Sequence, residues 1–285
     1  MTKIGFIGLG LMGAQMAGHL LDAGFALNVH TRTRAKAEEL IGRGAHWCDS
    51  PAAVAGQSDA VITIVGAPAD VEQVYFHGIL EHARPGTLLI DMTTSSPSLA
   101  ARLHAEGAKR GQRVLDAPVS GGQGGARAAS LAIMGGGDAG NFSAALPLLE
   151  KMGIKILHCG AAGSGQRMKL TNQTLLASNL IGVAEGLAFA RKGGLDPKTV
   201  LATLAESTGA SIMLKSYGEK IFNGDYAAGF MVDHFIKDMG IAAAEADALG
   251  LNLSSLRNSL AQFKRLRDEF AAGADGIQAI ARLYA

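Results

Sequence analysis

The sequence predicts an α/β protein, with an N-terminal doubly wound parallel sheet joined by a long helix to an all-α C-terminal domain. Up to about residue 160, short runs rich in Ile and Val alternate with amphipathic helical patterns. Beyond that point the strand-like runs stop, and stretches of Ala, Leu, Glu and Lys follow, broken by turn and capping signals. We therefore expect two domains, residues 1–162 and residues 163–285.

The strands of the N-terminal sheet are expected where apolar runs are bounded by turn residues. These runs are residues 3–8, 26–30, 60–66, 87–92, 113–118 and 131–136. Helical periodicity lies between several of them, at Met12–Ala23, Arg34–Gly42 and Pro97–Arg110. This alternation predicts parallel strands with helices on both faces of the sheet.

The C-terminal half begins with a helical pattern from about Gly165 to Lys192, roughly 40 Å at ~1.5 Å per residue. Such a helix is longer than a small domain needs, so we expect it to carry an interface of a homodimer or homotetramer as well. Asp196 before Pro197 predicts a helix N-cap followed by proline at the first helical position.

Composition narrows the classes of partner. Of the 285 residues 48% are hydrophobic and 18% charged, the net charge is +1, and no run of basic residues occurs. This balance argues against nucleic acid or an anionic membrane as the main partner and favours small molecules. Two distant cysteines predict neither a disulfide framework nor a zinc site, which fits a cytoplasmic protein. No spacing predicts a metal.

A glycine pattern follows the first expected strand. Gly8, Gly10 and Gly13 form G-x-G-x-x-G with Leu11 and Met12 between them, at the start of a helix. In this context the glycines allow a tight turn, close approach of a pyrophosphate and close helix packing, as in a Rossmann dinucleotide site. The alternative is a merely structural glycine turn.

The end of the second expected strand indicates which dinucleotide is preferred. NAD-binding domains usually place an acid here for the ribose 2′-hydroxyl. This chain has Thr31 instead, followed by Arg32 and Thr33, which offer donors suited to a 2′-phosphate. We expect NADP(H) to be preferred, with NAD(H) as the alternative cofactor. An exposed basic turn without a ligand is the competing interpretation.

A second glycine-rich stretch, Asp116–Gly137, lacks the strand-turn-helix context of a nucleotide loop in the sequence pattern. Its successive backbone N–H groups could form a concavity for an anion, and a carboxylate is the natural guest. Ser120 adds a hydroxyl group. The alternative is a flexible surface turn.

Five separated motifs together resemble the β-hydroxyacid dehydrogenase family, and the resemblance covers essentially the whole chain. The motifs are IGFIGLGLMGAQMAGHL from residue 4, IDMTTSSP from residue 90, DAPVSGG from residue 116, GSGQRMKLTNQ from residue 163 and FIKDMGIA from residue 235. The family includes 3-hydroxyisobutyrate dehydrogenases, tartronate semialdehyde reductases (2-hydroxy-3-oxopropionate reductases) and glyoxylate/succinic semialdehyde reductases. It contains oxidoreductases that interconvert a small 3-hydroxy acid and its semialdehyde.

The resemblance also implies roles for individual residues. By position in the motifs, and at the turns after the second and third strands, the resemblance implies that the catalytic residues are Lys169 and Asn172. It implies that the residues that bind substrate are Ser120, Gly121, Gly122, Thr94 and Gln173, and that those that bind the cofactor are Gly8, Gly10, Leu11, Met12, Gly13, Arg32, Thr33, Val65, Thr94 and Lys237. Specificity would come from side chains of the helical domain, each of which could instead belong to the core: Met213, Tyr217, Phe230, Met231 and His234.

Lys169 carries the chemical interpretation. A lone helix lysine is usually solvated. In the family motif, the matching lysine is the acid/base: its ammonium group can stabilise and protonate the alkoxide that hydride delivery to an aldehyde leaves. Two alternatives stay open, an imine reductase and a non-catalytic NADP-binding scaffold. Both usually lack this lysine, so Lys169 counts against them.

Overall fold

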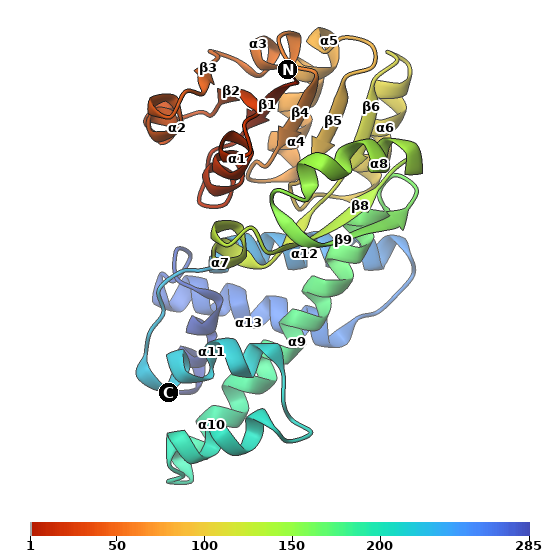
Figure 1. Cartoon of the computed structure of the whole chain (residues 1–285). Helices are drawn as coiled ribbons and strands as arrows, with labels where there is room; N and C mark the ends of the chain where they lie inside the picture. The colour runs from red at the N-terminus through yellow and green to blue at the C-terminus, as the bar shows by residue number, and fades with distance from the viewer. Residues whose placement is uncertain (1) are drawn as a thin grey trace. The chain divides into compact units, whose positions relative to one another are not determined.

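The computed structural model describes residues 2–285 and divides into two compact units. We call residues 1–169 the sheet unit and residues 170–285 the helical unit. The division falls inside the long helix α9 (Ser164–Lys192). The predicted fold class is confirmed: a largely parallel sheet with helices on both faces is followed by an all-helical part (Figure 1).

The sheet unit contains a nine-stranded sheet within the described residues. Its strands are β1 (Lys3–Ile7), β2 (Ala26–His30), β3 (His46–Trp47), β4 (Ala60–Thr63), β5 (Leu88–Asp91), β6 (Arg113–Asp116), β7 (Val119–Ser120), β8 (Leu131–Gly136) and β9 (Gly153–Gly160). Their order is β3-β2-β1-β4-β5-β6-β8-β7, with β9 paired to β8. A strand forms in each of the six stretches where the sequence predicts one. From β3 to β6 the pairing is parallel, so the carboxyl ends of these strands lie at one edge.

The far end of the sheet departs from the simple parallel prediction. Strand β8 is antiparallel to β6 and β7, while β9 runs parallel to β8. Sequence periodicity did not predict β9, because Ile154 and Leu157, two of its large apolar side chains, are exposed. An edge strand that is covered only in part, here at Ile156, lacks the alternation that identifies a half-buried strand.

Helices cover both faces of this sheet. They are α1 (Gly13–Asp22), η1 (Arg34–Ala37), α2 (Glu38–Gly42), α3 (Pro51–Gly56), α4 (Pro68–Val74), η2 (Tyr75–Ile79), α5 (Leu80–His82), α6 (Pro97–Ala108), α7 (Gly122–Arg127) and α8 (Ala139–Leu149). Successive strand residues point to opposite faces. In β4, for example, Ile62 joins the hydrophobic cluster with α1 and α8, whereas Val61 joins the cluster with α3, α4 and α6.

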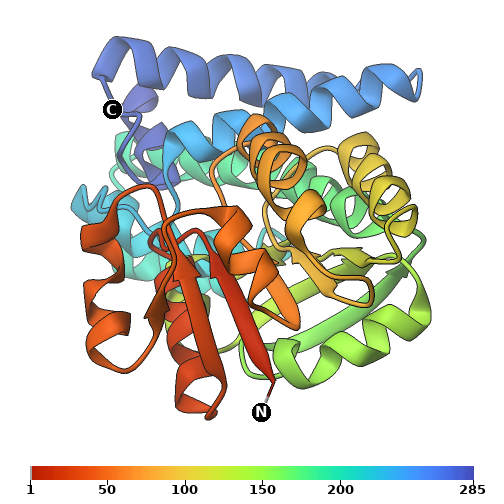
Figure 2. The same ribbon diagram turned by 90° about the horizontal axis from the view of Figure 1, so that it is seen from above.

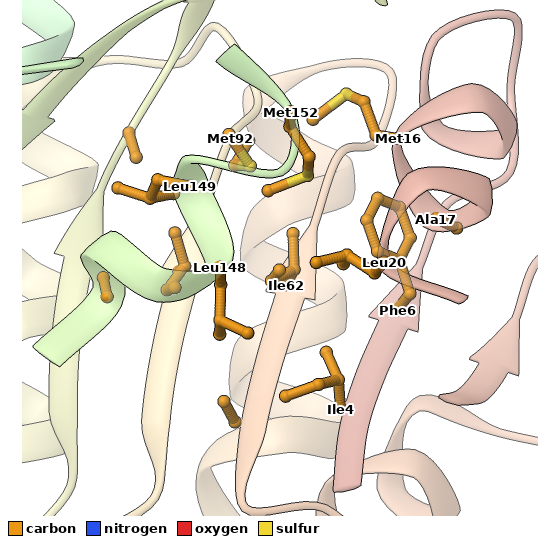
Figure 3. Close-up of a cluster of buried hydrophobic side chains, with 14 of the residues drawn as sticks. Ile4, Phe6, Met16, Ala17, Leu20, Ile62, Met92, Leu148, Leu149 and Met152 are labelled. Carbon is orange, nitrogen blue, oxygen red and sulfur yellow. The ribbon is translucent and has the colours of Figure 1, made fainter. Parts of the chain in front are cut away.

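Figure 3 shows the first of these clusters, in which β1 and β4 face α1 and α8. Phe6 and Ile62 are fully buried against Leu20 of α1 and Leu149 of α8. Burying one such side chain contributes roughly 1.5–3 kcal/mol. The cluster therefore fixes the position of α1, and with it the glycine turn that precedes α1.

The helical unit consists of the rest of α9 with α10 (Pro197–Ala205), α11 (Ile212–Asn223), α12 (Val232–Ala248), α13 (Ser254–Phe270) and η3 (Ile277–Tyr284). Helices α12 and α13 lie side by side as a hairpin (Figures 1 and 2). Phe235 of α12 packs edge-on against Phe263 of α13, with ring centroids 5.0 Å apart. The predicted cap of α10 is confirmed, since Asp196 accepts a hydrogen bond from the backbone N–H of Thr199 at 2.9 Å.

Helix α9 spans 29 residues, about 43 Å at ~1.5 Å per residue, as the sequence predicts. Among residues 2–285, no helix combines the length and apolar character that a membrane crossing requires.

Candidate active site

The glycine turn after β1 is built from two glycines that the fold requires and one that it does not. Gly8 has φ +101°, and a Cβ atom there would lie 2.1 Å from the carbonyl oxygen of Ile64. A Cβ atom on Gly13 would lie 2.0 Å from the carbonyl oxygen of Gly8. Gly10 differs, because an added Cβ would meet nothing within 4 Å. Packing therefore explains Gly8 and Gly13, while the space at Gly10 fits the close approach of a pyrophosphate.

The start of α1 also suits an anion. Met12 occupies the N-cap position and provides no side-chain acceptor for the first-turn N–H groups. Leu11 is half-exposed beside it. Since unpaired N–H groups at a helix N-terminus attract phosphate, the residues present fit a dinucleotide.

Arg32 and Thr33 follow β2, and Arg32 is partnered by an acid from another element. The Nη1 atom of Arg32 lies 3.2 Å from Oδ1 of Asp70, and the two side chains are 83% and 25% exposed. The other oxygen of Asp70 accepts a hydrogen bond from the backbone N–H of Ala67 at the start of α4. The expectation from the sequence considered only the end of β2, where no carboxylate occurs, and so missed the one that α4 supplies.

Arg34, two residues further on, points to a different environment. Its guanidinium lies over the ring of Trp47, 5.3 Å from the centroid, and pairs with Glu38 one turn along the chain. Arg32 is thus the more exposed of the two arginines, with a side chain 83% exposed against 61% for Arg34.

The segment after β5 is fixed by buried hydrogen bonds. Oγ1 of Thr93 accepts from the backbone N–H of Val65 at 2.9 Å, which ties the loop after β4 to the loop after β5. Asp91 Oδ1 in turn accepts from the N–H of Thr93 at 3.1 Å and from the hydroxyl of Thr63 at 2.8 Å. Burial raises the pKa of Asp91 to about 6, against the opposing effect of these hydrogen bonds.

Thr94 lies between two backbone groups that one side chain holds. The Oε1 atom of Gln166 accepts from the N–H of Ser95 at 2.9 Å, and its Nε2 atom donates to the carbonyl oxygen of Thr93 at 2.8 Å. Gln166 belongs to the first turn of α9 and is fully buried. Sequence reasoning missed it, although a glutamine on the buried stripe of a helix three residues before Lys169 was a usable signal.

Asp116, at the carboxyl end of β6, caps the same helix. Its two carboxylate oxygens accept from the backbone N–H groups of Gly163 at 2.7 Å and Gln166 at 2.8 Å. Burial raises the pKa of Asp116, and these hydrogen bonds oppose that effect. A Cβ atom on Gly165 would lie 2.8 Å from this carboxylate, so the glycine leaves room for the cap. Sequence reasoning treated Asp116 only as the start of the substrate loop.

Lys169 lies one turn after this capped helix start and is only 6% exposed. It is therefore not the solvated surface lysine that a helical pattern usually carries. Gln166, which connects α9 to the Thr93–Ser95 segment, lies on the same helix and in the same unit as Lys169.

The second glycine-rich stretch differs from its predicted form. The sequence pattern suggested no strand-turn-helix context, but Ser120 ends strand β7, Gly121 turns the chain with φ +134°, and Gly122 begins the short helix α7. The prediction was wrong because β7 has two residues and α7 has six, too few for a recognisable period.

In the helical unit, the predicted residues Asn172, Gln173 and Lys237 are connected through Asp238. The amide of Asn172 donates to Oε1 of Gln173 at 2.9 Å, and Nε2 of Gln173 donates to Oδ2 of Asp238 at 2.6 Å. The other oxygen of Asp238 lies 2.9 Å from Nζ of Lys237. Asp238 is almost fully buried and was not among the predicted site residues. The lysine motif that contains it was the available signal.

Three of the five side chains considered for specificity pack in the core of this unit. Met213, Tyr217 and Phe230 pack against its hydrophobic cluster, which supports the alternative that they are core residues. In residues 2–285, no group of three or more His, Cys, Asp or Glu side chains is arranged to hold a metal ion.

Comparison with known proteins adds independent information. Residues 3–160 match the family model of the NAD-binding domain of 6-phosphogluconate dehydrogenase. Residues 163–284 match the model described as NAD-binding of NADP-dependent 3-hydroxyisobutyrate dehydrogenase.

Individual relatives agree with these models. An NAD-dependent L-serine dehydrogenase from Pseudomonas aeruginosa is 40% identical and is aligned over 91% of each chain. A 3-hydroxyisobutyrate dehydrogenase from the same organism is 37% identical over 100% of this chain and 99% of its own. The solved structure of 3-hydroxyisobutyrate dehydrogenase from Mycobacterium tuberculosis with L-serine has a TM-score of 0.91 at 32% identity, covering 99% of both chains. The chain therefore belongs to the β-hydroxyacid dehydrogenase family of NAD(P)-binding oxidoreductases.

Proposed function

We propose that this protein is an NADP(H)-preferring oxidoreductase that interconverts a small 3-hydroxy acid and its semialdehyde, with Lys169 as the acid/base. The observation that carries the proposal is the burial of Lys169 next to a helix start that Asp116 caps and Gln166 ties to the Thr93–Ser95 segment. Burial of a lysine on the element that meets this segment supports a chemical role for it rather than solvation.

The proton transfer follows from the functional groups. NADP(H) supplies or accepts the hydride when bound. In the direction of reduction, the ammonium group of Lys169 stabilises the developing alkoxide and gives it a proton. In the direction of oxidation, neutral Lys169 removes the proton of the substrate hydroxyl. The amide of Asn172 provides a further hydrogen-bonding group one helical turn along α9.

The substrate class follows from chemistry that the named ligands of the relatives share. Serine and 3-hydroxyisobutyrate are both small carboxylates with a hydroxyl group on carbon 3. Ser120, Gly121 and Gly122 offer a hydroxyl and backbone N–H groups for the carboxylate.

The preference for NADP(H) rests on Arg32 and Thr33. The guanidinium of Arg32 is largely exposed and engages Asp70 through one nitrogen, so its remaining donors can bind a 2′-phosphate. Asp70 opposes this preference, because its carboxylate would repel the phosphate. We therefore expect a preference for NADPH rather than strict exclusion of NADH.

Association of copies of this chain is the remaining part of the proposal. A groove of about 510 Å³ runs along α9 in the helical unit and is lined by small residues, including Ser178, Gly182 and Gly186. Large apolar side chains close in sequence to other lining residues are exposed: Phe189, two residues after Leu187, at 83%, and Ile212, directly after Ser211, at 76%. Small residues with exposed apolar neighbours suit close packing of a second copy.

The experiment that tests the proposal follows nicotinamide absorbance with NADPH and NADH in parallel. Reduction is assayed with tartronate, methylmalonate and succinic semialdehydes and glyoxylate, and oxidation with L-serine and 3-hydroxyisobutyrate. Lys169→Ala should lower kcat by about 10²–10⁴-fold while NADPH still binds. Lys192→Ala, an exposed lysine at the end of the same helix, is the matched control.

The outcomes separate the competing functions. Full turnover by folded Lys169→Ala would remove the acid/base assignment. If the wild-type protein binds NADPH but reduces no carbonyl acid, an imine panel then decides between an imine reductase and a non-catalytic scaffold.

A further inference from the structure

The side chain of Gln166 joins helix α9 to the backbone on both sides of Thr94. We propose that Gln166 is a positioning residue that holds Lys169 in fixed register with the Thr93–Ser95 segment. This inference rests on the proposed role of Lys169, because register matters only if that lysine reacts with what Thr94 contacts.

The hydrogen-bond pattern defines the orientation of the amide. Oε1 accepts from the N–H of Ser95, and Nε2 donates to the carbonyl oxygen of Thr93. The reversed amide would place two acceptors together at Thr93 and two donors together at Ser95. Because Gln166 has no exposed surface, water cannot replace either hydrogen bond.

Gln166 is also held through its own backbone. Its N–H donates to Asp116 at the end of β6, and the same carboxylate accepts from Gly163. The residue is therefore fixed at its main chain by β6 and at its side chain by the segment that follows β5. A helix start held at both points can neither rotate nor slide relative to the carboxyl ends of these strands.

This double attachment lies next to the reactive group. Lys169 is three residues after Gln166 on the same face of α9, and Thr94 lies between the two backbone groups that Gln166 binds. Misplacement of a reacting group by about 1 Å costs up to about 100-fold in rate. Fixing the register here therefore acts on kcat more than on cofactor binding.

A second buried glutamine, Gln112, provides a control that distinguishes a positioning role from a general loss of core stability. Gln112 is also buried, and its Nε2 donates to the carbonyl oxygens of Leu80 and Ala83 at 2.9 and 2.8 Å. It precedes β6, whereas Asp116 ends that strand, so Gln112 lies at the amino end of the sheet. Gln112→Met is the matched control, since it removes a buried backbone-bridging amide away from Lys169.

Gln166→Met removes both hydrogen bonds at similar volume. We expect kcat to fall about 10–100-fold with NADPH affinity within about two-fold of wild type. Amide hydrogen exchange in a peptide spanning residues 92–97 should become faster, because Ser95 loses its acceptor. Gln112→Met should lower the urea midpoint but leave kcat and this exchange unchanged.

The hydrogen-bond pattern of Gln166 also predicts that Gln166→Glu recovers kcat when its carboxyl group is protonated. A protonated carboxyl has one donor and one acceptor, like the amide, whereas the carboxylate has no donor for the carbonyl of Thr93. Burial keeps such a carboxyl protonated well above its ordinary pKa of about 4.3. The kcat of Gln166→Glu relative to wild type should therefore rise as pH falls from about 9 to 5.5, while the ratio for Gln166→Met stays flat.

Two results would overturn the proposal: wild-type kcat in Gln166→Met, or a flat pH dependence of the Gln166→Glu ratio. Both are distinguishable from failure of the proposed function. If Lys169→Ala keeps turnover, the acid/base role fails even when the hydrogen exchange of residues 92–97 still responds to Gln166. If Lys169→Ala is inactive but Gln166→Met is not, only the positioning role fails.

Discussion

The two units place their buried polar groups differently. In the sheet unit, Asp91, Thr93, Asp116 and Gln166 gather where β5, β6 and α9 meet, and their hydrogen bonds connect loops to one another. In the helical unit, apolar contacts among α9, α12, α13 and η3 dominate, and buried polar side chains such as Gln173 and Asp238 are few. Buried hydrogen bonds fix the loops of the sheet unit, whereas close packing of apolar side chains stabilises the helical unit.

We therefore expect single substitutions in the sheet unit to change either the free energy of unfolding or the binding of the cofactor. Substitutions on the surface of the helical unit should instead change self-association.

The glycine turn offers the sharpest test within the sheet unit. Gly13→Ala should lower the free energy of unfolding by about 3 kcal/mol, because its methyl group would lie 2.0 Å from the carbonyl oxygen of Gly8. Gly10→Ala should leave cofactor-free stability unchanged, since nothing lies within 4 Å, and should weaken NADPH binding. Urea unfolding and NADPH titration measure the two effects. Loss of stability in Gly10→Ala would break the assignment of this space to the cofactor.

Asp91 gives the next largest effect, and it depends on pH. Its folded pKa of about 6 lies above the ordinary value of 3.8, so ionisation is harder in the folded than in the unfolded protein. The contribution of Asp91 to the free energy of unfolding is therefore most favourable below pH 3.8. It declines as the pH rises towards 6 and stays unfavourable above that. Asn at this position keeps an acceptor oxygen for Thr63 and Thr93 but does not titrate.

The unfolding free energy of Asp91→Asn, relative to wild type, should accordingly rise by about 3 kcal/mol between about pH 3 and pH 8. Urea unfolding at a series of pH values measures this difference. Parallel curves for the two proteins would show that Asp91 is not the group whose burial costs stability.

Arg32 should control the choice of cofactor with a smaller energetic effect. Arg32→Ala should lower the ratio of kcat/KM for NADPH to that for NADH by about ten-fold. Asp70→Asn should raise the ratio, because it removes a negative charge beside the 2′-phosphate. Arg34→Ala is the control, since Arg34 lies over Trp47 and pairs with Glu38. An equal loss in both arginine variants would mean that general positive charge, not Arg32, sets the preference.

The smallest change in folding is expected on the surface of the helical unit. Gly186→Leu should weaken self-association several-fold in sedimentation experiments without lowering the stability of the dissociated chain, since an added Cβ meets nothing within 4 Å. Gly140→Leu on α8 is the matched control, because that glycine is equally open. Unchanged association in Gly186→Leu would exclude the groove along α9 as an interface.

Periodic parts of this molecule could be predicted from the sequence, and single polar contacts could not. The alternation of apolar runs and helical patterns predicted β1, β2, β4, β5, β6 and β8, and the cap at Asp196 predicted the start of α10. Exposure of Ile154 and Leu157 hid β9, and the shortness of β7 and α7 hid the strand-turn-helix form of the loop around Gly121.

The candidate site shows the same limit. Motifs could suggest Lys169, but its burial depends on packing. The ion pair of Arg32 with Asp70 joins residues 38 positions apart, and the hydrogen bond of Gln166 to Thr93 joins residues 73 positions apart. No local pattern encodes such contacts. These contacts form only in the folded sheet, where the carboxyl ends of the strands lie at one edge.

The lack of charge on Gln166 has a consequence for the conditions in which the protein can work. Dissolved salt screens exposed ion pairs such as Arg32 with Asp70 and would equally screen a 2′-phosphate on Arg32. A buried amide that binds two backbone groups offers salt nothing to screen. In a concentrated electrolyte, the protein should therefore lose discrimination between its two nicotinamide cofactors before it loses turnover with either one.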